Sequence, residues 1–328
     1  MRLRRFVLAV AAAASLLGAA FARAPSWEWP TSVAPRVPRD NPMSPAKVEL
    51  GRRLFYDADL SIDGTMACST CHEQHRGFAD GNRTHAGVHG EPARRNVPGL
   101  ANVAWLPSFT WGDPRIRSLE TQVLVPVLGG EPVEMGMKGQ EREIAARLSR
   151  GDCYRIMFQT AFPETRGRID MPAVAKALAA FERTLISYDA LYDRARNGGA
   201  PLAPLIRQGE TVFRRDCSTC HAGPNFTDGQ FHKVGAWKPA DRGLGEVTGH
   251  QSDDGRFRTP GLRNVAVTGP YLHDGSASTI EDAIKYHAAL RGQGELPALL
   301  AFLATLTDEG FLKDPRFSLP ATACGKVL

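Results

Sequence analysis

Two five-residue stretches, Cys68-Ser-Thr-Cys71-His72 and Cys217-Ser-Thr-Cys220-His221, constrain this chain more than any other feature. Each is a complete C-x-x-C-H motif, in which two thiols can add to the vinyl groups of a haem and the adjacent histidine can bind its iron. A thioredoxin-like dithiol would need a βαβ setting, and a zinc site would need a second ligand pair at matching spacing. The motifs therefore predict two covalent c-type haems, attached through Cys68, Cys71, His72, Cys217, Cys220 and His221.

The first 22 residues have the three parts of a secretory signal peptide. Arg2, Arg4 and Arg5 form a basic start, an apolar run follows, and Ala20-Phe21-Ala22 is a small-x-small cleavage site. The apolar run is shorter than the ~20 residues of a membrane-spanning helix, and no other run approaches that length. We therefore expect residues 1–22 to be removed, a periplasmic mature protein, and no membrane span.

The charge balance does not indicate a polyanionic partner. The 328 residues carry a formal net charge of +5, but Arg2, Arg4 and Arg5 lie in the signal segment and Arg23 lies beside the cleavage site. The mature protein is thus nearly neutral, so its charge supports no inference of binding to nucleic acid or to a membrane, and we expect no nucleic-acid partner.

Length and motif spacing predict two domains. About 300 mature residues suffice for two hydrophobic cores, and Asn197-Gly-Gly-Ala-Pro201 is rich in turn formers. We expect a Pro- and Trp-rich extended arm over 23–43, an N-terminal cytochrome c-like domain over 44–197 and a C-terminal one over 198–328. Each domain would carry one haem.

The hydrophobic pattern predicts a mainly α fold with long loops and little β structure. Ser44-Pro45 opens a helix that ends near Asp57, and Ser278 with Glu281 forms a capping box. Further helices are expected over 115–128, 141–149, 152–162, 171–192, 205–215, 278–290 and 297–306. A Gly-x-x-aliphatic-Phe pattern precedes both haem motifs, at Gly51 and Gly209, and indicates two related units.

Two cysteines, Cys153 and Cys324, lie outside the motifs. In an oxidising compartment they could form a disulfide if they lie close together. Free buried thiols are the alternative.

A polar turn follows the predicted helix at 115–128. Leu119-Glu-Thr-Gln122 leads on to Gly130-Glu-Pro-Val-Glu134-Met135, which presents carboxylates at the end of an apolar helix. A protein with two haems is an enzyme if one iron has an open face next to a group that can accept and donate a proton. Without such a face it is an electron carrier. Glu134 is a candidate for that group, whereas Glu131 is expected to be solvated.

These residues resemble the bacterial di-haem cytochrome c peroxidase and MauG superfamily over essentially the whole mature chain. The matching stretches are both C-S-T-C-H motifs, Trp111 before S-L-E-x-Q, Pro132-Val-Glu-Met135, and Thr259-Pro-Gly-Leu-Arg-Asn264 running on to Thr268-Gly-Pro-Tyr-Leu-His-Asp-Gly275. The Trp-rich arm and Asn41-Pro-Met-Ser44 are more similar to the di-haem enzymes found beside methanobactin-related genes than to the short peroxidases.

The resemblance implies three functional residues near the N-terminal haem. Glu134 matches the acid/base beside the open iron, and Gln122 matches a polar residue that can hydrogen-bond a bound oxygen. Trp111 matches the tryptophan that relays electrons between the two haems. The interval from Trp111 to Glu134 is a few residues longer than in the peroxidases, so Trp105 is kept as an alternative.

The resting ligand of the N-terminal iron is open. His85 and His89 lie in the loop where peroxidases carry a capping histidine, and His89 has the better spacing. A loop histidine with no ligand role is the alternative.

The resemblance also places a sixth ligand of the C-terminal haem iron, at His287, where peroxidases carry Met and MauG-like enzymes carry Tyr. His287 lies on the same helix face as Ile280 and Ile284, whereas the alternative, Tyr286, is about 100° away. A bis-histidine haem has a lower potential than a His/Met haem. This ligation therefore argues against a high-potential haem that receives electrons from a small cytochrome.

A calcium ion is a further implied cofactor. Asn96 with the backbone carbonyls of Thr268 and Pro270 matches the family's calcium site between the domains, and oxygen ligands suit a hard cation. An asparagine that only holds a turn is the alternative.

The resemblance implies an exported enzyme that reacts with hydrogen peroxide to form high-valent iron and oxidises a side chain of a partner protein, as MauG does. One alternative is a cytochrome c peroxidase that reduces hydrogen peroxide with electrons from a small cytochrome or cupredoxin. A second is a non-enzymatic di-haem electron carrier, in which both irons are six-coordinate and Glu134 has no role.

Overall fold

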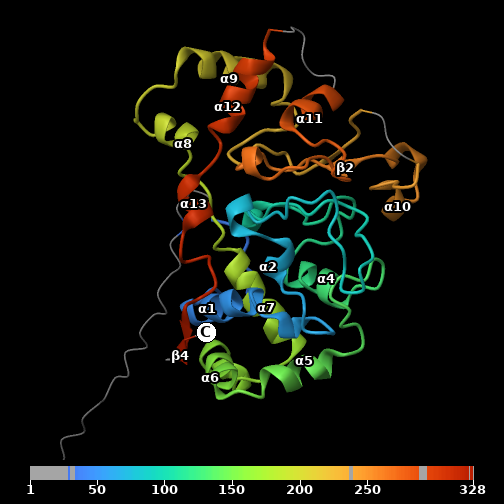
Figure 1. Ribbon diagram of the computed structural model, residues 1–328, viewed down its shortest axis with the longest axis vertical. Coiled ribbons are helices and arrows are strands. Elements are labelled where there is room, and N and C mark those ends of the chain that lie inside the picture. Colours follow the sequence, from blue (N-terminus) through green and yellow to red (C-terminus); the bar gives the residue numbers. More distant parts are fainter. Residues whose placement is uncertain (1–28, 30–33, 236–238, 288–293, 325, 328) are drawn as a thin grey trace, which may run out of the picture.

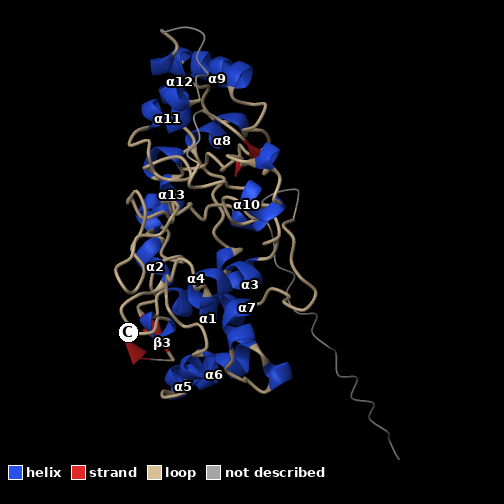
Figure 2. Cartoon of the chain, turned by 90° about the vertical axis from the view of Figure 1, so that its right-hand side faces the viewer, coloured by secondary structure: helices blue, strands red, loops and turns tan. Residues whose placement is uncertain are grey.

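The protein is built of helices joined by long loops, as predicted. The computed structural model describes residues 29, 34–235, 239–287, 294–324 and 326–327, so the predicted signal peptide and most of the arm lie outside the described residues. Within these ranges two small antiparallel ladders pair β1 (Phe231–His232) with β2 (Phe257–Arg258) and β3 (Thr322–Ala323) with β4 (Lys326–Val327). Figure 2 shows helices gathered at both ends of the molecule, with mostly loops between them.

Two pairs of helices form the framework. In the N-terminal half α1 (Pro45–Phe55) packs against α7 (Met171–Glu182), and in the C-terminal half α9 (Pro204–Asp216) packs against α12 (Leu296–Ala304) (Figure 1). Each of these four helices has a proline in its first turn. Because the first N–H groups of a helix have no partner within it, a proline there loses no hydrogen bond.

Each pair is brought together at a glycine. A Cβ atom on Gly51 would lie 1.9 Å from the carbonyl oxygen of Ala177, and one on Gly209 would lie 1.8 Å from that of Ala298. No side chain fits at such a distance, so only glycine permits these crossings. The repeated Gly-x-x-aliphatic-Phe pattern therefore corresponds to the same helix contact in both halves.

The phenylalanine of the repeat completes each contact. The ring centroid of Phe55 lies 5.3 Å from that of Phe181, and the ring centroid of Phe213 lies 5.1 Å from that of Phe302. All four side chains are buried. Aromatic pairs at this spacing add to the free energy gained by burying the rings.

A second part of the repeat joins the two halves. Asn102 and Asn264 both end a P-G-L-x-N stretch, both have a positive φ (58° and 61°), and both begin a 3-10 turn, η3 (Val103–Trp105) and η6 (Val265–Val267). Asn102 donates to the carbonyl oxygen of Ser187 (2.9 Å) and Asn264 donates to its hydroxyl oxygen (3.0 Å). All three residues are buried, so the halves meet at a polar contact.

The remaining elements are short. The helices are α2 (Cys68–Cys71), α3 (Leu119–Gln122), α4 (Leu124–Leu128), α5 (Glu141–Leu148), α6 (Asp152–Ala161), α8 (Leu191–Arg196), α10 (Gly245–Thr248), α11 (Ile280–Tyr286) and α13 (Glu309–Lys313), and the other 3-10 turns are η1 (Ala58–Leu60), η2 (Gln74–Arg76), η4 (Pro163–Thr165) and η5 (Gln251–Asp253). No helix in these described ranges is both long and apolar enough to cross a bilayer.

Three predicted helices end or begin elsewhere. The helix expected over 115–128 is two short ones, because Pro126 has no N–H to donate to the carbonyl of Gln122. The helix expected over 171–192 ends at Glu182, because Asn102 takes the backbone groups of Leu185 and Ser187.

The last of these helices is capped by a different residue from the one predicted. The hydroxyl oxygen of Thr279, not that of Ser278, accepts from the N–H of Asp282 and starts α11 (3.0 Å). Residues 288–290, where this helix was expected to end, lie outside the described part of the chain.

The last residues of the chain return to the N-terminal half (Figure 1). Phe311 and Phe317 belong to the same buried cluster as Phe55. Cys153 and Cys324 form a disulfide, with Cα atoms 5.5 Å apart, so the disulfide alternative is confirmed. The C-terminal domain predicted over 198–328 thus ends in a tail that packs on the N-terminal half. The predicted boundaries did not anticipate this contact between residues far apart in the chain.

Gly51→Ala tests the helix crossing. Because the new methyl group would overlap the carbonyl of Ala177, α1 and α7 must separate, and we expect a loss of at least about 2 kcal/mol in the free energy of unfolding. Gly294→Ala is the control, since that exposed glycine has no atom within 4 Å of its Cβ position. Denaturant unfolding measures both variants, and equal stability would contradict this account.

Candidate functional site

Both haem motifs present their histidine in the same way. The Nδ1 atom of His72 donates to the carbonyl oxygen of Phe78 (2.6 Å), and that of His221 donates to the carbonyl oxygen of Phe226 (3.0 Å). Phe78 and Phe226 have a positive φ (65° and 54°), which turns each carbonyl toward its histidine. In both histidines Nε2 is left to bind a metal.

The chemical state of these residues suits haem attachment. Burial lowers the pKa of His72, and it lowers the pKa of His221 to about 4, so both imidazoles are neutral, as a metal ligand must be. The four motif cysteines are free thiols, whereas Cys153 and Cys324 are paired. The residues present therefore fit two covalent haems.

A cavity of about 400 Å³ lies beside the second motif. It is lined mostly by apolar side chains together with Cys217, Cys220, His221 and His287. The ring centroids of His221 and His287 are 6.4 Å apart. Two imidazoles on opposite faces of one iron, with metal–nitrogen bonds of about 2 Å, have centroids about 6 Å apart, so this pair fits an iron between them.

The neighbours of His287 also favour it as a ligand. Its Nδ1 atom donates to the carbonyl oxygen of Ala283 (2.7 Å), so Nε2 remains for the iron. The ring of Tyr286 packs against Gly235, although it lines the same cavity.

Glu134 lies near His85, which in turn contacts Cys71 of the first motif. Its side chain is partly buried, and burial raises its pKa while the nearby charge of His85 lowers it. The loop over 85–93 covers this turn, since the N–H of Val88 donates to the carbonyl oxygen of Glu134 (2.8 Å). Glu131 is exposed, as expected, and Gln122 is partly buried at the end of α3.

The two loop histidines occupy different places. His85 is partly buried, donates through Nδ1 to Asp80 (2.8 Å), and lies next to Cys71. His89 is exposed and lies beside Asp63, because a turn at Gly87–Gly90 carries it outward. The structure thus favours His85 over His89, the residue preferred from spacing, as the histidine near the N-terminal haem.

An Asp–His pair lies next to the second cysteine of each motif. Asp80 with His85 lies beside Cys71, and Asp228 with His232 (2.7 Å) lies beside Cys220. Sequence reasoning missed these pairs, although both aspartates belong to a repeated F-x-D-G stretch. Cys220, Asp228 and His232 could together hold a metal ion, but haem attachment would use Cys220.

Trp111 lies between the two halves. It is 9% exposed, its indole N–H donates to the carbonyl oxygen of Asn96 (2.8 Å), and its own carbonyl accepts from the N–H of Arg258 in β2 (2.8 Å). It also lines the cavity that contains His221. Trp105 is not among the residues described as lining that cavity, and it packs on Tyr188 instead.

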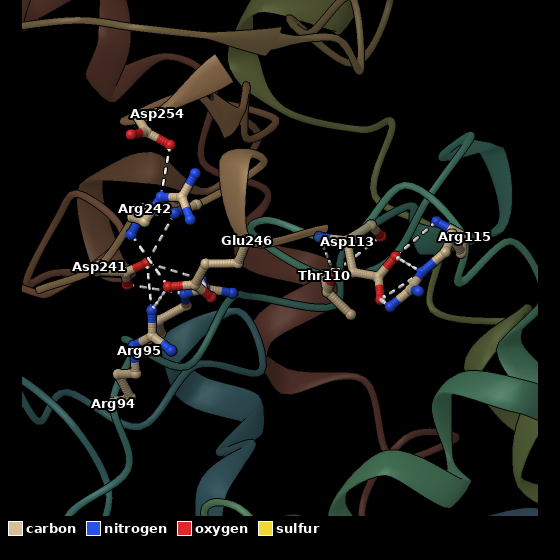
Figure 3. A network of polar contacts seen from close by, with 10 residues as sticks. Arg94, Arg95, Thr110, Asp113, Arg115, Asp241, Arg242, Glu246 and Asp254 are labelled. Atoms are coloured by element: carbon tan, nitrogen blue, oxygen red, sulfur yellow. Dashed lines mark hydrogen bonds and ion pairs between the residues drawn. The ribbon is translucent and has the colours of Figure 1, made fainter. Parts of the chain in front are cut away.

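A network of ion pairs holds the loop that carries Asn96 (Figure 3). Arg95 donates through Nε and Nη2 to the two carboxylate oxygens of Asp241 (2.9 and 2.8 Å), and Arg94 reaches Asp241 (2.7 Å) and Glu246. Burial alone would raise the pKa of Asp241, but the two arginines lower it to about 2. The network therefore ties Asn96, and through it Trp111, to the C-terminal half.

The three residues predicted to bind calcium come from both halves of the chain. Asn96, Thr268 and Pro270 all line the wall of the same cavity. The side-chain Nδ2 of Asn96 donates to the carbonyl oxygens of Asn82 (3.1 Å) and Arg83 (3.3 Å), so Oδ1 is the amide atom that remains for a cation.

Comparison with known proteins identifies the family. A sequence model of di-haem cytochrome c peroxidase matches residues 45–200. The methylamine utilization protein MauG of Methylorubrum extorquens is 33% identical over 267 residues, which cover 80% of this chain and 73% of that protein. The chain belongs to the di-haem cytochrome c peroxidase and MauG family. Membership of this family implies haem c cofactors, and the relatives are named as oxidoreductases. The protein is therefore an enzyme, in contrast to the alternative of a non-enzymatic electron carrier.

Other relatives do not separate MauG-like enzymes from peroxidases. Cytochrome c551 peroxidase of Nitrosomonas europaea is 30% identical over 317 residues, covering 93% of this chain and 91% of that protein. Among solved structures, a MauG-like protein associated with microbial copper homeostasis matches with a TM-score of 0.85 and 36% identity, over 90% of this chain and 99% of that one. The names of these relatives therefore do not identify the substrate of this protein, which we infer from its site.

Asp241→Asn tests the ion-pair network. We expect the variant to lose about 1–3 kcal/mol at pH 7, because buried charge-assisted hydrogen bonds to Arg95 are weakened. The Asp241 pKa is depressed on folding, so its contribution is present above about pH 4 and is lost as the pH falls toward 2. The stability difference between wild type and variant should shrink over that range.

Asp113→Asn is the matched control for this prediction. Asp113 pairs with Arg115, whose side chain is 70% exposed, and such pairs contribute about 1 kcal/mol or less. Equal losses in the two variants at pH 7 would contradict a structural role for Asp241.

Proposed function

We propose that this protein is a periplasmic MauG-like enzyme that reacts with hydrogen peroxide and oxidises a side chain, such as tryptophan, of a partner protein. The observation that carries this proposal is the pair of imidazoles, His221 and His287, which both line the C-terminal cavity with ring centroids 6.4 Å apart. The signal peptide over 1–22 and the two domains, 44–197 and 198–328, belong to the same proposal.

The chain would hold its two haems through the residues predicted above. Cys68 and Cys71 would attach the first haem and His72 would bind its iron, while Cys217, Cys220 and His221 would do the same for the second. When bound, the haems supply the redox centres through which electrons reach hydrogen peroxide.

Glu134 is proposed to move the proton. Burial raises its pKa, although the nearby charge of His85 lowers it, and a raised pKa suits a group that must first accept a proton from one peroxide oxygen and then return it to the departing one. The loop over 85–93 shields this turn from water, and Gln122 is proposed to donate a hydrogen bond to peroxide. Trp111 would relay electrons between the two redox centres.

His287 favours a protein-oxidising enzyme over a peroxidase. Two imidazoles stabilise the oxidised iron and lower its potential, whereas a thioether ligand raises it. A low potential suits a centre that stores an oxidising equivalent and is unfavourable for accepting electrons from a small cytochrome or cupredoxin. The peroxidase is retained as the alternative, because the relative from Nitrosomonas europaea carries that name.

A calcium ion between the halves is part of the proposal. Asn96 Oδ1 with the carbonyls of Thr268 and Pro270 would provide oxygen ligands. Such an ion would stiffen the loop that also holds Trp111.

Glu134→Gln tests the proton-transfer step. We expect the variant to retain both haems but to react with hydrogen peroxide about 100-fold or more slowly, the usual effect of losing a general acid/base. Absorption and EPR spectra before and after one equivalent of peroxide measure this. Glu131→Gln, at the exposed neighbour, should behave as wild type, and unchanged kinetics in Glu134→Gln would refute the assignment.

His287→Met tests the axial ligand. The potential of the C-terminal haem should rise, by on the order of a few hundred millivolts, because thioether ligation disfavours the oxidised iron. Tyr286→Phe is the control and should leave the potential unchanged. A shift in Tyr286→Phe without one in His287→Met would assign the ligand to Tyr286 instead.

The same experiments separate the two enzyme functions. A long-lived oxidised species formed without added reductant, together with slow consumption of reduced cytochrome c, would support a protein-oxidising enzyme. Rapid consumption of reduced cytochrome c would instead support a peroxidase.

A further inference from the structure

The C-terminal tail, from α13 onward, forms part of the surroundings of the first haem motif. It lies against η2, which begins two residues after His72. The Nε2 atom of Gln74 in η2 donates to the carbonyl oxygens of Phe311 (3.3 Å) and Asp314 (2.8 Å). The Oε1 atom of Gln74 accepts from the hydroxyl of Ser318 (2.8 Å). Both polar groups of this side chain therefore hold the tail.

The tail is also attached farther along its length. It runs past α1 toward β3 and β4, as the red end of the chain in Figure 1 shows. The hydroxyl of Tyr56, directly after α1, donates to the carbonyl oxygen of Phe317 (2.7 Å). Beyond this contact, the disulfide joins Cys324 to Cys153 near the start of α6. The disulfide therefore closes the last part of the tail onto the N-terminal half.

One ring of the tail supports the residue that binds the motif histidine. The ring centroid of Phe311 lies 5.6 Å from that of Phe78, and both side chains are buried. The carbonyl oxygen of Phe78 accepts from Nδ1 of His72 (2.6 Å), and its φ is 65°. A positive φ is unfavourable for a residue with a bulky side chain, so surrounding contacts must hold it. Phe311 and Phe55 (5.9 Å) provide such contacts.

The second motif obtains the same support from helices near it in the chain. Phe226 there takes the place of Phe78, with its carbonyl on His221. Its ring packs against rings from α8, α9 and α12, which are those of Tyr192 (5.4 Å), Phe213 (5.7 Å) and Phe302 (6.4 Å). The described ring contacts of Phe78, apart from Phe55, come from the tail. The first motif therefore depends on a segment more than 200 residues away in sequence.

We propose that the C-terminal tail positions the iron ligand of the first haem. Phe311 holds the carbonyl of Phe78 against His72, and the disulfide fastens the tail that carries Phe311. A hydrogen bond from Nδ1 to a carbonyl fixes the orientation of the imidazole and makes Nε2 a stronger donor to a metal. This inference rests on His72 as an iron ligand, which is part of the proposed function, but it involves neither peroxide nor a partner protein.

The test compares Phe311→Leu with Phe158→Leu in the haem-loaded protein. Each removes a buried ring from the same hydrophobic cluster, so we expect similar losses of stability. The ring of Phe158 in α6 pairs with those of Tyr154 and Phe162, and no described ring pair joins it to Phe78. Only Phe311→Leu should therefore act on the motif histidine.

Two measurements report on this contact. The iron–histidine stretching frequency in the resonance Raman spectrum of the ferrous N-terminal haem follows the strength of the Nδ1 hydrogen bond, and it should fall in Phe311→Leu. Hydrogen exchange of the peptide over 72–80, measured by mass spectrometry, should become about tenfold faster. Phe158→Leu should leave the frequency unchanged and accelerate this exchange less.

The double variant Cys153→Ser/Cys324→Ser tests the disulfide. It leaves the four motif cysteines in place, so both haems can still attach. We expect a lower stretching frequency and faster exchange over 72–80, in the same direction as in Phe311→Leu. Wild-type values in the double variant would overturn the role of the disulfide.

Two further results would overturn the role of Phe311. Equal frequencies in wild type and Phe311→Leu would mean that the tail only fills the hydrophobic core. Equal changes in Phe311→Leu and Phe158→Leu would mean that any loss of core packing disturbs His72.

The outcome is separable from that of the proposed function. If the protein carries both haems and fails to react with hydrogen peroxide, but Phe311→Leu lowers the frequency, the positioning role stands and the peroxide function fails. If the protein reacts with peroxide and the frequency is the same in Phe311→Leu, the positioning role fails and the proposed function stands.

Discussion

The closeness of two helices decides where each haem motif lies. The carbonyl of Ala177 occupies the space that a side chain on residue 51 would need, and the carbonyl of Ala298 does so for residue 209. Glycine therefore lets the lead helix of each half lie directly on its partner. Phe55 then reaches both Phe181 and the ring of His72, whose centroid is 6.4 Å away. The second motif begins directly after its lead helix α9, and Phe55 of α1 contacts the motif histidine of the first, so these crossings help to position the attachment residues.

Polar contacts add direction to the apolar packing that joins the two halves. Asn102 and Asn264 are buried and both donate to buried Ser187, and Arg95 binds Asp241 across the same boundary. Buried polar groups are costly unless paired, and their bonds are directional, so they favour one relative placement. A fixed placement suits the proposed function, in which two redox centres would exchange electrons through Trp111.

The two related halves differ in the polar residues near their haem motifs. In the first half a partly buried carboxylate, Glu134, lies near His85, which contacts the haem motif, whereas in the second half the ring centroid of a second imidazole, His287, lies 6.4 Å from that of the motif histidine. The position of Trp105 is a valine in the other half. These differences on a shared scaffold support the proposal that one half reacts with peroxide and the other stores and passes on the oxidising equivalent.

The sequence by itself determined the features that depend on neighbouring residues. The spacing of Cys68, Cys71 and His72, the helix starts at Ser44-Pro45, and the Gly-x-x-aliphatic-Phe repeat were all readable, because their chemistry acts over a few residues. The family resemblance and the place of Glu134 on its turn followed from the same short-range patterns. The helix face that His287 shares with Ile284 was predictable for the same reason.

Only the tertiary structure decided which distant residues meet. Asn102 ends α7 early by binding Leu185 and Ser187, the tail returns to form the Cys153–Cys324 disulfide, and Arg95 finds Asp241. His85 lies at the first motif and His89 does not, because a turn reverses the chain between them. These contacts depend on the paths of the loops, which are set by many weak interactions acting together. No pattern among neighbouring residues contains that information.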